Sequence, residues 1–103
     1  MTDRELLELA SKAAGIAVDW RESVKCLCYS SSPYNVAWSP LTDDGDALRL
    51  AVKLNLLVNI SGGRDVIATD GETDAREYSD GRDIYTATRR AIVRAAAAIG
   101  GAA

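Results

Sequence analysis

The sequence contains no histidine, and this absence limits the chemistry that the chain could perform. Histidine is the commonest general base near neutral pH and the commonest metal ligand in proteins. Without it, a serine nucleophile would need a lysine as its base, and Lys25 is the candidate near the serine-rich segment 30–32. We therefore expect no catalytic residue and no cofactor, and a chain that recognises a ligand without converting it.

Cysteine is also scarce, with two residues, Cys26 and Cys28, separated by one position. On a strand both side chains would project to the same face, and two thiols alone cannot complete a four-ligand zinc site. Their spacing does not suit the geometry of a stable disulfide. We interpret the pair as small apolar residues on a buried strand face and predict no metal site.

Long apolar runs and an excess of positive charge are missing as well. No apolar stretch approaches the length of a membrane span, and the N-terminal residues carry acids where a signal peptide needs positive charge. The net charge of −3 argues against direct binding of nucleic acid, because neutralising phosphates requires a clustered basic surface. We expect a cytoplasmic protein without membrane contact, whose 103 residues form a single domain.

The N-terminal residues predict a helix that ends at about Ala14. Thr2 and Glu5 have the spacing of a capping box, and Gly15 provides a stop signal. Apolar residues recur at helical spacing, which places them on one face: Leu6, Leu9, Ala10 and Ala13.

Two further helices are predicted. One begins near residues 42–44, where acidic side chains favour the positive end of the helix dipole, and ends near Leu54. The other spans about residues 83–99, is capped by Asp80 or Asp83 and stops at the glycine pair 100–101. Small residues along the last helix would let it lie close to a sheet.

Three segments rich in β-branched and apolar residues predict strands: residues 24–29, 55–60 and 66–69. The glycines at 62–63 favour a hairpin between the last two, and the polar segment 70–81 is predicted to be a mobile loop or the tip of a further hairpin. In residues 54–60, apolar side chains occur at both odd and even positions. This pattern indicates that both faces of the sheet are covered by other parts of the fold. The sequence thus predicts an α+β fold, a small antiparallel sheet with helices packed on it as an α/β/α sandwich, in the order α-β-α-β-β-α.

The loop after the first predicted strand is one candidate binding surface. The sequence has no phenylalanine, so every aromatic ring carries a polar group. Tyr34, Asn35 and Trp38 would combine rigid contact area with hydrogen-bonding groups, as binding loops do. The alternative is a plain connection around a tryptophan of the core.

Charged groups supply three more candidates. Asp43 and Asp44 stand with Asp46 at a helix start, where they could hold a divalent cation but more simply cap the helix. Arginines on the last helix could clamp phosphates or meet an acidic partner, or could form a solvated face: Arg89, Arg90 and Arg94. Five acids could imitate nucleic-acid phosphates towards a basic protein groove: Asp70, Glu72, Asp74, Glu77 and Asp80.

Three segments together resemble a known family. They are the Trp38-x-Pro40 motif that leads into the aspartate-rich helix start, the Leu-Leu-Glu-Leu-Ala run at 6–10 and the helix at 87–97. They resemble the phage ABA-sandwich domain family and the related NinX-type proteins of lambda-like phages, over nearly the whole chain. The resemblance implies an α/β/α sandwich made in a bacterial host from a phage or prophage genome, without enzyme activity.

The resemblance also implies a function through its class. Small acidic phage proteins are often inhibitors of host defence, so we expect the partner to be a host protein, such as a component of a CRISPR or another defence complex. One alternative is a sponge that captures a nucleotide signal through Tyr34, Trp38 and the three arginines. The other is a phage factor with a structural or housekeeping role, because a fold does not determine a function.

Overall fold

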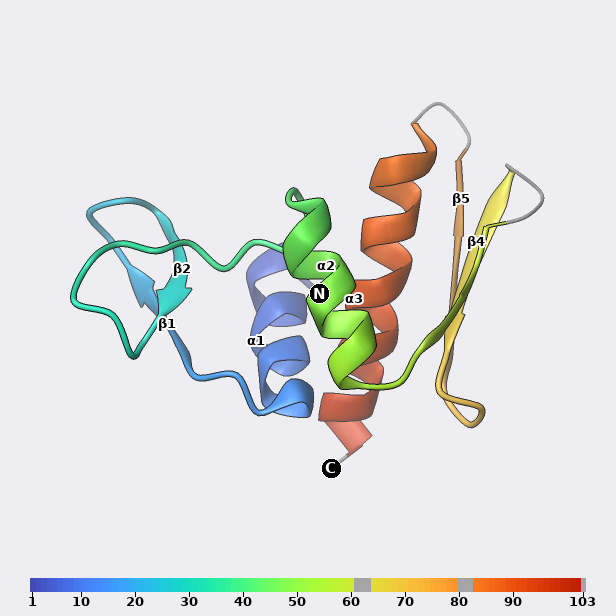
Figure 1. Ribbon diagram of the computed structural model, residues 1–103, viewed down its shortest axis with the longest axis horizontal. Helices are drawn as coiled ribbons and strands as arrows, with labels where there is room; N and C mark the ends of the chain where they lie inside the picture. Colours follow the sequence, from blue (N-terminus) through green and yellow to red (C-terminus); the bar gives the residue numbers. More distant parts are fainter. Residues whose placement is uncertain (61–63, 80–82, 103) are drawn as a thin grey trace.

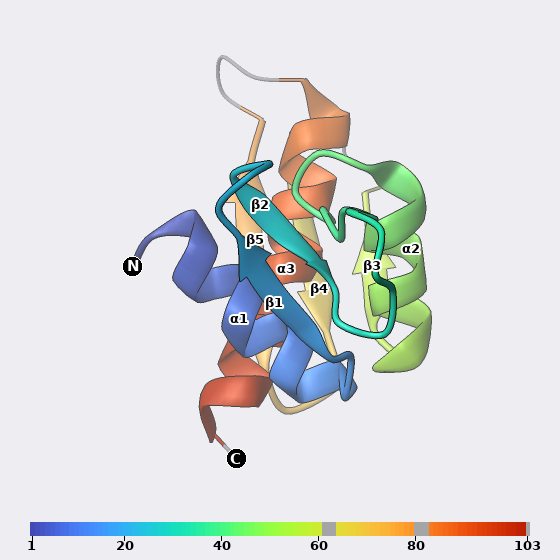
Figure 2. The same cartoon turned by 90° about the vertical axis from the view of Figure 1, so that its left-hand side faces the viewer.

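The computed structural model describes residues 1–60, 64–79 and 83–102. In this part of the chain, three helices lie between two small antiparallel sheets, as Figure 1 and Figure 2 show. One sheet contains β1 and β2, and the other has the strand order β3–β4–β5. Along the chain the elements are α1 (Asp3–Ala14), β1 (Val18–Arg21), β2 (Cys26–Tyr29), α2 (Asp44–Lys53), β3 (Leu57–Asn59), β4 (Asp65–Thr69), β5 (Asp74–Tyr78) and α3 (Ile84–Ala102).

The helices α1 and α2 confirm the two helices that were predicted from capping residues near their ends. In α1, the Thr2 hydroxyl accepts the Glu5 N–H at 3.1 Å, and the Glu5 carboxylate accepts the Thr2 N–H at 3.1 Å, which completes the capping box. Gly15 ends α1 with a φ of 68°, a conformation that glycine adopts without strain. In α2, the Asp43 carboxylate accepts the Asp46 N–H at 2.8 Å.

The last helix begins as predicted but ends elsewhere. The Asp83 carboxylate accepts the Thr86 N–H at 2.8 Å and so caps α3, while the alternative cap, Asp80, lies outside the described residues. The predicted stop at Gly100 and Gly101 is wrong, because α3 continues to Ala102. Gly100 is buried where α3 crosses α1, so it permits close helix packing and does not terminate the helix.

The β1–β2 hairpin corrects the first predicted strand. Within segment 24–29 only residues 26–29 are extended, since Lys25 has a φ of 54° and belongs to the turn. The partner strand β1 was not predicted: Val18 pairs with Tyr29 and Arg21 with Cys26 in antiparallel register. Its alternation of apolar and charged residues spans four positions, which is too short to be distinctive.

The β3–β4–β5 sheet confirms the predicted antiparallel hairpin of β3 and β4, whose turn glycines lie outside the described residues. Within the segment predicted to be a loop or hairpin tip, residues 74–78 form the strand β5. The turn before it contains Gly71 with a φ of 98°. The α+β class is therefore confirmed, and the predicted element order is replaced by α-β-β-α-β-β-β-α.

The helices cover one face of this sheet. Val66, Ala68 and Ala75 are buried towards α3, whereas Leu57 and Tyr78 are 66% and 56% exposed. In Figure 1 no described helix lies beyond the sheet, so the predicted α/β/α sandwich is wrong for the described part of the chain. Residues 54 and 56, which suggested cover on both faces, precede β3 and pack against the core from the α2–β3 connection. Among the described helices, none combines the length and the apolar character of a membrane span.

Candidate binding groove

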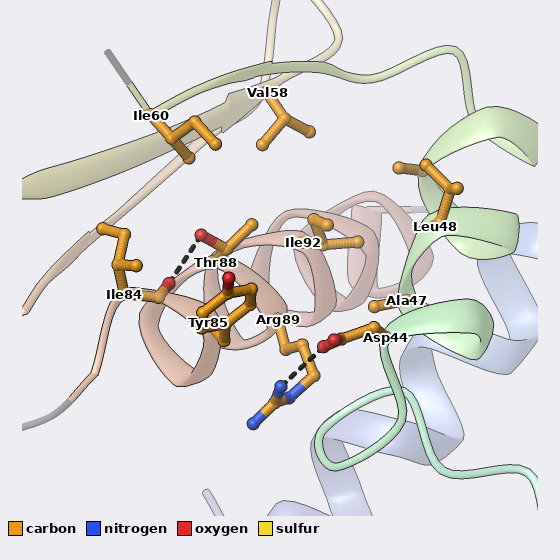
Figure 3. Close-up of a pocket in the computed structure, with 11 residues that line it drawn as sticks. Asp44, Ala47, Leu48, Val58, Ile60, Ile84, Tyr85, Thr88, Arg89 and Ile92 are labelled. Carbon is orange, nitrogen blue, oxygen red and sulfur yellow. Dashed lines mark hydrogen bonds and ion pairs between the residues drawn. The ribbon is translucent and has the colours of Figure 1, made fainter. Parts of the chain in front are cut away.

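A groove of about 430 Å³ lies between α2, α3 and the end of β3. Figure 3 shows its floor on α3, with Val58 and Ile60 along one side and Ala47 and Leu48 along the other. The floor is apolar because Ile84, Thr88 and Ile92 recur every four residues and share one face of α3. The Thr88 hydroxyl donates to the Ile84 carbonyl at 2.7 Å, so its hydrogen-bonding need is met within the helix.

A shallower hollow of about 520 Å³ continues this groove along α2. It shares Leu48, Ala51 and Val58 with the first and extends to Val52 and Leu56. Large apolar side chains stay exposed around both hollows: Leu48 at 64%, Val52 at 68%, Ile60 at 49% and Tyr85 at 65%. The two hollows therefore form one apolar surface, which we call the α2–β3 groove.

A hydrogen-bonded chain of polar groups borders one end of the α2–β3 groove. Arg89 donates to the Asp44 carboxylate at 2.6 Å (Figure 3) and to the Thr86 hydroxyl at 3.2 Å, and that hydroxyl donates to Asp83 at 3.0 Å. The Thr86 N–H and hydroxyl hold the pKa of Asp83 below its ordinary value. Arg89 also donates to the Leu41 carbonyl at 2.9 Å. Among the described residues, this chain of hydrogen bonds thus contains two carboxylates, Asp44 and Asp83, and one guanidinium, so they leave this end of the groove acidic.

The three arginines of α3 that the sequence singled out bind acceptors of the protein itself. Arg89 joins α3 to the start of α2, as described above. Arg90 donates to Asp3 at 3.2 Å, and Arg94 donates to the Arg76 carbonyl at 2.9 Å and to Glu77. These contacts hold α3 to its neighbours, and they do not favour the nucleotide-sponge hypothesis, which needs the guanidinium groups for phosphate.

The predicted surface of Tyr34, Asn35 and Trp38 is not assembled. Trp38 is 2% exposed and belongs to the core, while Tyr34 is 76% exposed in the loop. The residue that organises this loop is Arg21, whose side chain is 18% exposed and which was not among the predicted site residues. Its guanidinium donates to the carbonyls of residues 29, 32 and 34 at 2.8–2.9 Å and to the Asn35 side chain at 3.4 Å. An arginine at the end of a short strand carries no sequence signal for this role.

Replacing Arg21 with lysine should loosen residues 30–36. Lysine keeps the charge, but a single ammonium group cannot satisfy carbonyls that a guanidinium reaches in several directions at once. We expect faster amide hydrogen exchange in the loop and unchanged exchange in α3. The matched variant Arg76→Lys, at an arginine whose side chain is 52% exposed, should leave loop exchange unchanged. Equal protection of the loop in both variants would contradict the role of Arg21.

The predicted acidic groups are dispersed. Asp43 caps α2, Asp44 pairs with Arg89, and the described residues contain no group of three or more side chains arranged to hold a metal ion. Asp70 accepts the N–H groups of residues 72 and 73 in the β4–β5 turn, and these bonds hold its pKa below the ordinary value. Glu72 and Asp74 are exposed beside that turn, Glu77 is paired with α3 arginines, and Asp80 lies outside the described residues. The five acids do not form one described face.

No protein-family model, curated protein or solved structure matches this chain at a significant level. The α2–β3 groove is therefore judged by its own chemistry: an apolar surface with an acidic end, formed by residues that are far apart in the sequence.

Proposed function

We propose that this chain is a non-enzymatic protein that binds a segment of another protein in the α2–β3 groove. The observation that carries the proposal is the gathering of exposed Leu48, Val52 and Tyr85 around the two adjoining hollows of the α2–β3 groove. Single exposed apolar side chains are common on proteins, whereas a contiguous apolar patch with a polar rim is typical of interaction sites. A volume of about 430 Å³ is enough to receive side chains of a partner.

As the partner we propose a host protein whose action the chain blocks, such as a component of a CRISPR or another defence complex. This part depends on the resemblance to phage proteins, and the groove contributes the place of contact. The phosphate-mimic idea receives less support, because Glu77 is paired with Arg90 and Arg94. We therefore place recognition in the apolar groove and not on the acids of residues 70–80.

Affinity capture from host lysate with two leucine variants tests the proposal. Leu48 and Leu57 are 64% and 66% exposed, but only Leu48 lines the groove, since Leu57 lies on the outer sheet face. Glutamate at either exposed position should change the free energy of unfolding by no more than about 0.5 kcal/mol. We expect the wild-type chain and Leu57→Glu to retain the same host protein, and Leu48→Glu to lose it. Equal retention by both variants, or no retained protein, would contradict the proposal.

A further inference from the structure

We infer that the partner enters the α2–β3 groove as an extended segment that adds a strand to β3, with apolar side chains at alternate positions and a Lys or Arg on the same face. This inference rests on the proposed function and specifies the chemistry of its ligand. It follows from three observations: the position of β3 in its sheet, the apolar residues that line the groove floor, and the sign of the exposed charge at the rim of the groove.

The position of β3 makes strand addition possible. In the described sheet β3 pairs with β4 along one side only, and Val58 of β3 lines the α2–β3 groove together with Ile60, which directly follows the strand. An edge strand offers backbone hydrogen-bonding groups to a further strand, and recognition by strand addition draws affinity from such main-chain bonds. A fourth strand would continue the sheet across the part of α3 that β3 leaves uncovered.

The groove fits one face of such a strand. In an extended segment, alternate side chains point to the same side, and adjacent strands lie about 4.8 Å apart. The inward side chains would therefore meet Ile84, Thr88 and Ile92, next to Val58 of β3. The outward side chains would lie beside Leu57, outside the groove. The site thus selects apolar residues at alternate positions and leaves the intervening ones unconstrained.

Charge complementarity selects a basic residue. At the rim, the Asp44 side chain is 67% exposed, whereas its partner Arg89 is 17% exposed and already donates to Leu41 and Thr86. Asp83, linked to the same chain of hydrogen bonds, is exposed as well. Among the described residues, the accessible charge at this end is therefore negative. A Lys or Arg that shares the inward face with the apolar side chains would reach it across the groove.

A synthetic peptide tests this inference directly. The probe is acetyl-Lys-Thr-Val-Thr-Ile-Thr-Val-amide, in which Lys, Val and Ile share one face. We expect it to bind the full chain, with contacts between its Hα atoms and those of β3 in nuclear Overhauser spectra. Binding should weaken about tenfold when Glu replaces Lys, as the loss of one charge-assisted hydrogen bond implies. A peptide of the same composition without alternation should bind more weakly than the probe.

Two charge-matched variants locate the basic contact. Asp44→Asn should abolish the preference for the Lys peptide over the Glu peptide, whereas Asp74→Asn, at an exposed acid of β5, should keep it. No binding of the probe, equal binding of the alternating and non-alternating peptides, or contacts confined to α2 and α3 would overturn the inference. The proposed function would then still stand or fall with the capture experiment on Leu48→Glu, which uses no peptide.

Discussion

Replacing Gly100 with alanine will destabilise the protein, although alanine is the better helix former. A Cβ atom at position 100 would lie 2.1 Å from the Leu9 carbonyl oxygen and 2.9 Å from its carbon. These are backbone atoms, which cannot turn aside as a flexible side chain can, so α1 and α3 must move apart. Overpacking of this kind costs about 1–3 kcal/mol, and we expect the upper part of that range because the obstacle is backbone. Urea unfolding followed by circular dichroism measures the change.

Gly101 provides the matched control, because it is the next residue of the same helix and a Cβ there would meet no atom within 4 Å. Gly101→Ala should leave stability unchanged or raise it by up to about 1 kcal/mol, the intrinsic preference of a helix for alanine. The two alanine variants should therefore shift the unfolding midpoint differently, with Gly100→Ala clearly the less stable. A Gly100→Ala variant as stable as Gly101→Ala would show that α1 and α3 do not approach as described.

Comparing Gly100 with Gly15, the glycine that ends α1, shows which features of the fold the sequence could not predict. The ends of α1 and the start of α2 could be predicted because their signals are local: Thr2 and Glu5 satisfy each other, and Asp43 caps its own helix. Gly15 and Gly100 are the same residue type, yet one ends a helix and the other continues it. The difference depends on whether a second helix lies against the glycine, and the local sequence does not contain that information.

The strand β5 could not be predicted for a related reason. Its residues Asp74 to Tyr78 are mostly polar, and the position of its inward Glu77 depends on arginines of α3. Glu77 and Arg94 were both candidate site residues, named as members of separate groups, and the structure brings them together as an ion pair. Glu77 and Arg94, which the sequence presented as candidate binding groups, therefore form an ion pair that holds β5 to α3.

The α2–β3 groove was even harder to predict from the sequence. Asp44 and Arg89 were identified individually, but their contact at 2.6 Å joins residues from different helices. The apolar residues of the groove, such as Leu48 and Ile84, have the spacing of core positions. What exposes them is that the sheet ends at β3 and leaves part of α3 uncovered, which becomes visible only when the strand order is known.

Asp46 carries the second large effect on stability, because its nearly buried carboxylate connects three parts of the fold. It accepts the Ser39 N–H at 2.9 Å, the Tyr29 hydroxyl at 3.4 Å and the Arg49 guanidinium at 2.7 Å, and its side chain is 8% exposed. Alanine at this position would leave part-buried donors without an acceptor. We expect the free energy of unfolding to fall by about 2–4 kcal/mol. Asp74→Ala, at an exposed acid, should change it by no more than about 0.5 kcal/mol.

The pKa of Tyr29, which lies beside Asp46, distinguishes the loss of this contact from a general destabilisation of the fold. Burial, and then the negative charge of Asp46, raise the pKa of Tyr29 above its ordinary value. Removing the carboxylate while the chain stays folded should therefore lower the pKa of Tyr29, because its phenolate would no longer face a negative charge. Ultraviolet titration of the folded Asp46→Asn variant, which keeps an acceptor but not the charge, measures this shift. An unchanged titration of Tyr29 would mean that Asp46 does not hold the β1–β2 hairpin against α2.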